Sequence, residues 1–299
     1  MRLINPDIRF EVTNRCNYCC VVCPREKQKR EQGTMSLELF RKTCDQGLEI
    51  GMKQASLVGY GEPLLDPTFF EKAEYAKAGG IFLYTITNAS LLDREAARNM
   101  VEVDFDCIRI SCYGIDRESF MKVHGRDKFD QVVANIEYLF ELKKKGKPKI
   151  EIYFLLSETN IGLEEGFKKM WQGRADDISI WRPHNWSDGR RYRQATKQKV
   201  TCGRPMDGPL QVQWSGIMVP CCWCYDDQIV LGDANINSLE EIVKGKAYEA
   251  LRDAHRNGEF GKYPFCDGCD QLEQRSDSLV FTTIRNSQVG RTNTNQFAL

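Results

Sequence analysis

The chain has 299 residues, 41% of them hydrophobic and 28% charged, which is typical of a globular protein that buries a sizeable core. Lysine and arginine together number 42, as do aspartate and glutamate, so no net positive charge favours nucleic acid as a partner. No apolar run approaches the ~20 residues of a membrane span, and the N-terminus lacks the apolar segment of a signal peptide, so we expect a cytoplasmic protein that does not bind membranes.

Short strand patterns alternate with helical patterns over the first two-thirds of the chain. This alternation predicts a parallel α/β sheet wound as a partial (β/α)6 barrel over residues 1–200. In such folds the chemistry gathers at the carboxyl ends of the strands. The strands are expected at residues 8–12, 54–61, 81–88, 106–113, 149–156 and 177–183, and the helices at 36–51, 68–77, 93–101, from 130 onward, and 163–171.

The pattern changes after about residue 200. Residues 210–214 and 217–220 predict a β-hairpin that turns at Ser215 and Gly216. Ser238 and Glu241 form a capping box, which predicts a helix that runs to about Asn257. We therefore expect a small C-terminal α+β domain at residues 201–284, followed by a polar tail at residues 285–299.

Three cysteines, Cys16, Cys20 and Cys23, directly follow the first predicted strand. A [4Fe–4S] cluster is normally held by four cysteinates, so a loop that offers three leaves one iron open to a ligand that is not protein. A structural zinc site would instead close its tetrahedron with paired ligands, and a disulfide framework would suit a short secreted chain. The spacing therefore favours an iron–sulfur cluster with one open iron.

This cysteine loop after the first strand of a parallel barrel resembles the radical S-adenosylmethionine (SAM) superfamily, over about residues 6–280. The resemblance implies that SAM chelates the open iron through its amine and carboxylate. An electron from the reduced cluster then cleaves SAM to methionine and a 5′-deoxyadenosyl radical, so the cofactor carries the difficult chemistry. It also implies an external one-electron reductant such as flavodoxin or ferredoxin.

Further motifs of that family are similar to segments at the ends of later predicted strands. Gly61 and Glu62 resemble the glutamate motif, in which the carboxylate accepts from the SAM ammonium and glycine keeps the backbone close. Thr87 and Asn88 resemble the Thr-Asn-Gly motif, and Ser111 is placed to reach the ribose or carboxylate of SAM.

The chain departs from the family pattern at three positions. Val22 stands where an aromatic residue usually packs near the adenine of SAM. Tyr60 replaces the first glycine of the glutamate motif, and Ala89 replaces the last residue of Thr-Asn-Gly. These differences alter details of the expected SAM pocket and leave its cysteine ligands unchanged.

A second cysteine set resembles the C-terminal domain called SPASM, or its short form, twitch. The resemblance implies one auxiliary [4Fe–4S] cluster, held by Cys202, Cys221, Cys266 and Cys269. Cys222 or Cys224 could replace Cys221 as a ligand, and zinc is the alternative for any four-cysteine site. With four protein ligands this cluster would be closed.

Candidate catalytic residues follow from position. Cys112 is expected at a strand end that faces the radical, where a weakly held thiol hydrogen could quench a substrate radical in an epimerase. Arg182 and His184 follow the sixth predicted strand and could move a proton on a polar substrate. His124 and His255 are expected at the surface. The other cysteines are expected to be spare, at Cys19, Cys44, Cys107, Cys222 and Cys224.

The resemblance thus implies a radical SAM oxidoreductase or epimerase that abstracts hydrogen from a polar small molecule, such as a sugar or aminocyclitol. Its cofactors would be two [4Fe–4S] clusters and SAM. A maturase that modifies a ribosomally made precursor peptide is one alternative, and a non-enzymatic zinc or iron–sulfur binding protein is another.

Overall fold

One ten-stranded sheet organises the computed structural model, which describes residues 2–143, 146–192, 197–274 and 278–283. Six consecutive strands run parallel in chain order. They are β1 (Asp7–Phe10), β2 (Gln54–Leu57), β3 (Phe82–Thr87), β4 (Cys107–Ser111), β5 (Lys149–Leu155) and β6 (Asp177–Trp181).

The sheet continues beyond both ends of this parallel set. Strand β8 (Leu210–Val212) lies parallel to β1, and β9 (Ile217–Val219) and β10 (Gly232–Asp233) extend that side with antiparallel pairing. At the other end β12 (Leu279–Thr282) pairs antiparallel with β6. The order β10-β9-β8-β1-β2-β3-β4-β5-β6-β12 does not return to its start, so the sheet of the described residues is an open barrel. A separate pair joins β7 (Lys197–Gln198) to β11 (Glu273–Gln274).

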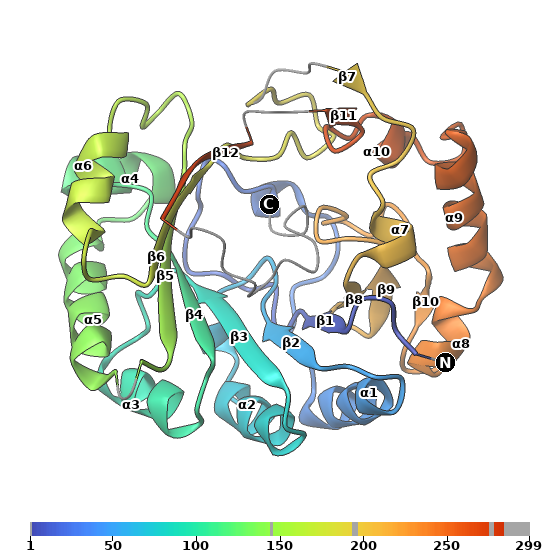
Figure 1. Ribbon diagram of the computed structural model, residues 1–299, viewed down its shortest axis with the longest axis horizontal. Helices are drawn as coiled ribbons and strands as arrows, with labels where there is room; N and C mark the ends of the chain where they lie inside the picture. Colours follow the sequence, from blue (N-terminus) through green and yellow to red (C-terminus); the bar gives the residue numbers. More distant parts are fainter. Residues whose placement is uncertain (1, 144–145, 193–196, 275–277, 284–299) are drawn as a thin grey trace.

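Helices cover the convex side of the parallel strands (Figure 1). They are α1 (Leu37–Glu49), α2 (Phe69–Ala78), α3 (Arg94–Glu102), α4 (Arg117–His124), α5 (Phe129–Leu142) and α6 (Glu164–Trp171). The C-terminal part adds α7 (Arg204–Asp207), α8 (Leu239–Val243), α9 (Lys246–Asn257) and α10 (Pro264–Asp267), and two 3₁₀ turns lie at η1 (Arg25–Lys27) and η2 (Pro63–Leu65).

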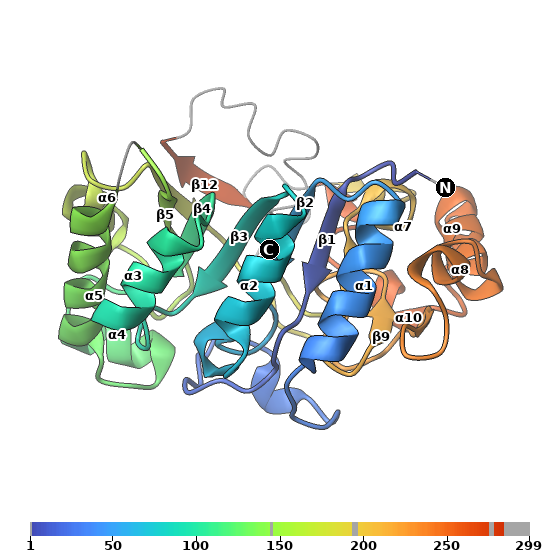
Figure 2. The ribbon, with the colours of Figure 1, turned by 90° about the horizontal axis from the view of Figure 1, so that it is seen from below.

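The core forms because the parallel strands are apolar on the side that the helices cover. Ile108, Ile110, Ile150 and Ile152 are fully buried, as parallel strands between two covered faces require. The loops that lead from each parallel strand to the next helix lie at the carboxyl ends of the strands. The loop after β1 projects from this end of the sheet (Figure 2). The cysteine loop is therefore at the carboxyl ends of the strands.

The predicted partial (β/α)6 barrel is confirmed, with one difference among the barrel helices and one in the C-terminal segment. Helix α4 was not predicted; Asp116 caps it and Gly125 ends it in the left-handed conformation, at φ 70°. The predicted helix over residues 238–257 is two helices, because Gly245 adopts an extended conformation between α8 and α9. The expected tail at residues 285–299 lies outside the described residues.

The expected hairpin is present, and its turn at Gly216 has φ 90°. Strand β8 of this hairpin pairs with β1, so the main sheet continues across the boundary expected at residue 200. The C-terminal segment is thereby placed beside the loop that follows β1. None of the helices in the described part of the chain is long and apolar enough to span a membrane.

A buried ion pair anchors the segment between β2 and α2. The Lys72 ammonium lies 2.5 Å from Asp66 Oδ2, and both side chains are fully buried. The same ammonium donates to the Met35 carbonyl at 2.6 Å and to Thr68 Oγ1 at 2.8 Å. These bonds use all three ammonium hydrogens and join the start of α1 to the turn that follows Glu62.

We expect Lys72→Met to lower the free energy of unfolding by about 3–5 kcal/mol, because it leaves the Asp66 carboxylate buried without its partner. Denaturant unfolding monitored by circular dichroism measures this loss. The double variant Lys72→Met, Asp66→Asn should recover part of it, since no charge is then buried. A loss below about 1 kcal/mol in the single variant would show that the pair is not needed.

Candidate active site

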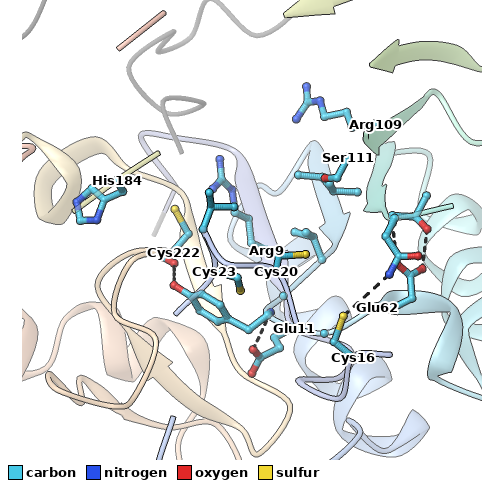
Figure 3. A pocket seen from close by; sticks show the side chains of 18 of the residues that line it. Arg9, Glu11, Cys16, Cys20, Cys23, Glu62, Arg109, Ser111, His184 and Cys222 are labelled. Carbon is cyan, nitrogen blue, oxygen red and sulfur yellow. Dashed lines mark hydrogen bonds between the residues drawn. The ribbon is translucent and has the colours of Figure 1, made fainter. Parts of the chain in front are cut away.

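A single cavity at the carboxyl ends of the strands brings together residues of the barrel and of the C-terminal segment. In the view of Figure 3, Cys16, Cys20 and Cys23 lie between Glu62 on one side and Cys222 on the other. Of the predicted site residues, the cavity is lined by Cys16, Cys20, Val22, Cys23, Tyr60, Gly61, Glu62, Thr87, Asn88, Ser111, His184 and Cys221.

The three cysteines of the first set lie half-buried in one turn, in which the Cys23 amide donates to the Cys20 carbonyl at 3.0 Å. Burial raises the pKa of Cys23 to about 11, and the neighbouring Cys16 thiolate adds to this shift. Burial also raises the pKa of Cys20, and both neighbouring thiolates raise it further. Such thiols ionise together only when a cationic group joins them, which suits a metal cluster.

The Glu62 carboxylate is held by residues at the end of β3. Thr87 Oγ1 donates to Oε1 at 2.6 Å, and the Asn88 amide donates to Oε2 at 2.7 Å. Glu62 is nonetheless buried, and the loss of hydration outweighs these bonds and raises its pKa to about 7. The Asn88 side chain bonds Asn17 at 2.9 Å, so the same strand end also orients the cysteine loop.

Gly61 allows the cysteine loop to pack directly on the end of β2. A Cβ atom at Gly61 would lie 2.4 Å from the Arg15 carbonyl oxygen and 2.5 Å from that of Thr13. The Glu62 amide also donates to the Arg15 carbonyl at 2.9 Å. The glycine is therefore required by contact between two backbones.

Tyr60 and Val22 contact the C-terminal side of the cavity. The Tyr60 hydroxyl donates to the Cys222 carbonyl, and its ring packs edge-on against Trp186 and Tyr225. The Val22 carbonyl accepts from the Trp186 indole at 3.0 Å. Tyr60 and Val22, which both differ from the family pattern, thus contact the loops that contain Trp186 and residues 222–225.

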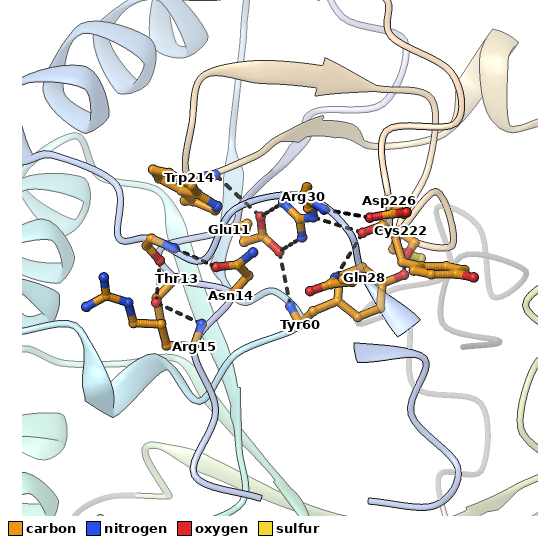
Figure 4. A network of polar contacts seen from close by, with 12 residues as sticks. Glu11, Thr13, Asn14, Arg15, Gln28, Arg30, Tyr60, Trp214, Cys222 and Asp226 are labelled. Atoms are coloured by element: carbon orange, nitrogen blue, oxygen red, sulfur yellow. Dashed lines mark hydrogen bonds and ion pairs between the residues drawn. The ribbon is translucent and has the colours of Figure 1, made fainter. Parts of the chain in front are cut away.

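A buried Glu11–Arg30 pair closes the segment that carries the three cysteines (Figure 4). The Arg30 guanidinium donates to both oxygens of the Glu11 carboxylate, at 2.6 and 2.5 Å. The amides of Tyr60 and Trp214 also donate to this carboxylate, at 3.2 and 3.5 Å. Arg30 Nε donates to the Tyr225 carbonyl at 2.9 Å, so the pair connects β1, β2 and the C-terminal segment.

The second predicted cysteine set also gathers in one place. Burial raises the pKa of Cys221 to about 12, and the nearby Cys202 thiolate contributes. The pKa values of Cys266 and Cys269 are raised by burial first and then by the Cys221 and Cys202 thiolates. The four sulfurs therefore lie close enough to interact, as the ligands of one cluster must.

The two cysteines considered as alternative ligands, and Cys112, considered as a hydrogen donor, occupy different environments. Cys222 and Cys224 both line the cavity; Cys222 lies near Arg9, and the buried Cys224 thiol donates to Gln228 Oε1 at 3.4 Å. Cys112 is fully buried in the hydrophobic core, and its thiol lies 3.8 Å from the Gly114 carbonyl. The expectation that Cys112 faces the radical is wrong, because Ser111 points into the cavity and side chains alternate along a strand.

Arg182 and His184 lie in different places, and only His184 lines the cavity. The Arg182 amide bonds the Ser278 carbonyl at 2.9 Å, and its side chain does not line the cavity. His184 lines the cavity, with Nε2 at 2.9 Å from Asp270 Oδ1. A proton-shuttle role for Arg182 is therefore not supported, since the strand pairing of β6 with β12 directs this residue away from the cavity.

The expectation that His124 and His255 lie at the surface is wrong. Both are buried, at 0% and 1% exposure. Helix α4 places His124 at its last residue, where burial lowers its pKa to about 3 and keeps the ring neutral. Sequence reasoning missed α4 and hence this residue, although the Asp116 cap at its start was a readable signal.

Sequence reasoning also missed two buried arginines in the cavity. Arg9 and Arg109 lie in the middle of β1 and β4 and line the cavity opposite the helices. Glu151 accepts from Arg109 Nε at 2.7 Å, and Asp7 lies 3.6 Å from Arg9 Nε. The available signals were the alternation of charged residues at Asp7, Arg9 and Glu11 in and just after the first strand and the single arginine in the fourth strand, Cys107–Ser111.

Comparison with known families agrees with this geometry. The family model of the radical SAM superfamily matches residues 10–169, more than half of the chain. The chain belongs to the radical SAM superfamily. A second model, for an iron–sulfur cluster-binding domain called SPASM, matches residues 202–270. These two matches imply SAM and [4Fe–4S] clusters as the cofactors of this radical SAM protein.

Its curated relatives include a probable GTP 3′,8-cyclase of Sulfurisphaera tokodaii, 28% identical over 52% of this chain and 48% of that protein. A GTP 3′,8-cyclase of Chlorobaculum tepidum is 33% identical over 44% of this chain and 40% of that protein. The radical SAM protein thus spans about half the length of the curated relatives it matches.

Solved structures share its fold at low sequence identity. BtrN in complex with AdoMet and 2-DOIA is 18% identical with a TM-score of 0.65, covering 94% of this chain and 100% of that one. SuiB of Streptococcus suis bound to precursor peptide SuiA is 13% identical with a TM-score of 0.67, covering 90% and 70%. These similarities support the open-barrel fold of the radical SAM protein.

We expect Gly61→Ala to prevent assembly of the first cluster, because the new methyl group collides with two backbone carbonyls of the cysteine loop. Iron and sulfide analysis after anaerobic reconstitution measures the loss. Gly261→Ala is the control, since a Cβ there meets no atom within 4 Å. Normal iron content in Gly61→Ala would contradict the close packing of β2 and the loop.

Proposed function

We propose that this radical SAM protein oxidises a polar small molecule, of the sugar or aminocyclitol class, in the cavity between its two cysteine sets. The observation that carries the proposal is that residues of both sets line one cavity, Cys16, Cys20 and Cys23 from one side and Cys221 from the other. A substrate between them is within reach of both the radical and the auxiliary cluster.

On the SAM side, the cluster and SAM supply, when bound, the radical that abstracts a hydrogen atom from the substrate. Cys16, Cys20 and Cys23 hold the cluster and leave one iron open. Glu62 would accept from an N–H of the SAM amine, and Thr87 and Asn88 fix the orientation of the Glu62 carboxylate through the two hydrogen bonds described above.

On the substrate side, polar groups line the remaining wall of the cavity. Arg9 and Arg109 present guanidinium donors, and Ser111, Tyr153 and Gln213 add hydroxyl and amide groups. Asp7 and Glu151 balance the two buried cations, which lets them remain charged away from water. This inventory suits a substrate rich in hydroxyl or amino groups, whose hydrogen bonds these donors and acceptors can satisfy.

The auxiliary site favours oxidation over other outcomes. Four cysteines, Cys202, Cys221, Cys266 and Cys269, complete the ligands of one cluster and leave no iron for the substrate. When bound, such a cluster would accept the second electron that the substrate loses, while the accompanying proton passes to solvent. The solved complex of BtrN with AdoMet and 2-DOIA, whose fold matches 94% of this chain, supports a small-molecule substrate.

Epimerisation is the second candidate, and the position of Cys222 favours it. Its thiol lines the cavity and is outside the four-ligand set that we assign. A thiol there can return a hydrogen atom to the substrate radical, the role first expected of Cys112. Peptide modification is a third outcome to test, since SuiB and anSMEcpe were both solved with peptides bound.

For oxidation, we expect Cys221→Ala to retain 5′-deoxyadenosine formation and to lose the oxidised product, because the electron acceptor is disrupted. Anaerobic assays with a panel of aminocyclitols and sugars, read by mass spectrometry, measure both products. Cys222→Ala is the adjacent comparison and should still form the oxidised product. Unchanged turnover in Cys221→Ala would rule out an electron-accepting cluster, and solvent deuterium in the product would favour epimerisation.

SAM binding should weaken as the pH falls below about 7, because the carboxylate form of Glu62 is the one that accepts from the SAM amine, and the raised pKa of Glu62 makes its protonation accessible. The affinity should fall about tenfold per pH unit below that value and level off above it. Equilibrium dialysis of reconstituted protein from pH 6 to 8.5 measures this. Glu62→Gln should bind weakly at every pH, and a pH-independent affinity in the unaltered protein would contradict the assignment.

A further inference from the structure

Two of the three histidines in the chain lie against cysteines that we assign as cluster ligands. His124 Nδ1 is 3.2 Å from Cys20 Sγ in the first set. His184 Nε2 is 3.3 Å from Cys269 Sγ in the second set. Each cysteine set therefore has one buried imidazole next to one of its sulfurs.

The tautomer of His124 follows from its other ring nitrogen. The Tyr113 backbone amide lies 3.0 Å from His124 Nε2, and an amide N–H can only donate. Nε2 is therefore the acceptor and carries no hydrogen. In a neutral imidazole the single hydrogen is then on Nδ1, where it points at Cys20 Sγ.

The same argument applies to His184 with the two nitrogens exchanged. The Trp186 amide donates to Nδ1 at 2.7 Å, which places the hydrogen on Nε2. Here two acceptors are in reach, since Asp270 Oδ1 lies at 2.9 Å and Cys269 Sγ at 3.3 Å. The sulfur of Cys269 thus receives a shared and weaker donor than Cys20 does.

Both rings are fixed by aromatic stacking and by the loops around them. The His124 ring stacks on Tyr113 with centroids 4.7 Å apart, and the Cys19 and Val21 amides donate to carbonyls at the end of α4. The His184 ring stacks on Trp223 at 4.6 Å. Neither ring can turn its N–H away from the cysteine without losing both the hydrogen bond from the backbone amide and the aromatic stacking.

We propose that His124 and His184 tune the two iron–sulfur clusters by donating N–H···S hydrogen bonds to Cys20 and Cys269, from tautomers that backbone amides select. This inference deepens the proposed function and rests on its assignment of cluster ligands. A hydrogen bond withdraws negative charge from the thiolate and stabilises the reduced cluster, which raises its potential. Because His124 has no competing acceptor among its described contacts, its effect is the larger one.

The test uses the reconstituted protein and EPR-monitored redox titration, in which SAM addition identifies the first cluster. His124→Phe removes the donor and should shift the midpoint of the first cluster to a more negative potential, leaving the auxiliary cluster unchanged. His124→Gln retains an amide donor and acceptor and should restore most of the shift. His184→Phe should lower the auxiliary potential by a smaller amount and leave the first unchanged.

The third histidine supplies a matched control. His255 Nδ1 bonds Thr201 Oγ1 at 2.9 Å and lies 4.0 Å from Cys202 Sγ, which is 0.7 Å longer than the 3.3 Å contact between His184 and Cys269. His255→Gln should therefore leave the first midpoint unchanged and shift the auxiliary midpoint less than His184→Phe does. Unaltered potentials in His124→Phe with full iron content, or equal shifts of both clusters in that variant, would overturn the proposal.

The hydrogen bond can also be tested without a substitution, which matters if a variant fails to bind its cluster. Protein labelled with ¹⁵N-histidine should show a ¹⁵N hyperfine coupling to the reduced first cluster in pulsed EPR. The absence of that coupling would overturn the proposal. If the coupling is present but 5′-deoxyadenosine never forms, the hydrogen bond stands and the proposed function fails, so the two failures can be told apart.

Discussion

The buried Glu11–Arg30 pair is the constraint on which the cavity depends. Glu11 follows β1 and Arg30 lies beyond the third cysteine, so their two hydrogen bonds close the segment that holds Cys16, Cys20 and Cys23. The same carboxylate accepts from Tyr60 at the end of β2, and the same guanidinium reaches Tyr225 in the C-terminal segment. A bidentate arginine–carboxylate pair fixes direction as well as distance, which a lysine could not do. The cysteine loop, the barrel and the auxiliary site are thereby held around one cavity.

Charge balance inside this cavity follows one pattern. The cations Arg9, Arg30 and Arg109 each have a carboxylate nearby: Asp7 on the same strand for Arg9, Glu11 just after β1 for Arg30, and Glu151 on the neighbouring strand β5 for Arg109. Burial and repulsion between neighbouring thiolates raise the pKa values of the Cys20, Cys23 and Cys221 thiols. These sulfurs would therefore ionise when a cationic metal cluster binds them.

Much of the fold was predictable because it depends on local patterns. The strand–helix alternation and the cysteine spacing gave the barrel and the first ligand set, and the hairpin at Ser215 and Gly216 was correctly placed. What was missed depends on contacts distant in sequence. The burial of His124 requires α4 to dock on the cysteine loop, and the pairing of β8 with β1 joins residues 200 positions apart. Cys112 was misplaced because a one-residue step along a strand reverses the direction of a side chain.

Two separate clusters are expected to face one cavity, the first held by the loop that Glu11 and Arg30 close. Iron and sulfide analysis measures their number in the reconstituted protein and in a variant with Cys16, Cys20 and Cys23 changed to alanine. Two four-iron clusters require about eight irons per chain in the unaltered protein and about four in the variant. An unaltered protein that binds about four irons, or zinc in place of iron, would contradict the account.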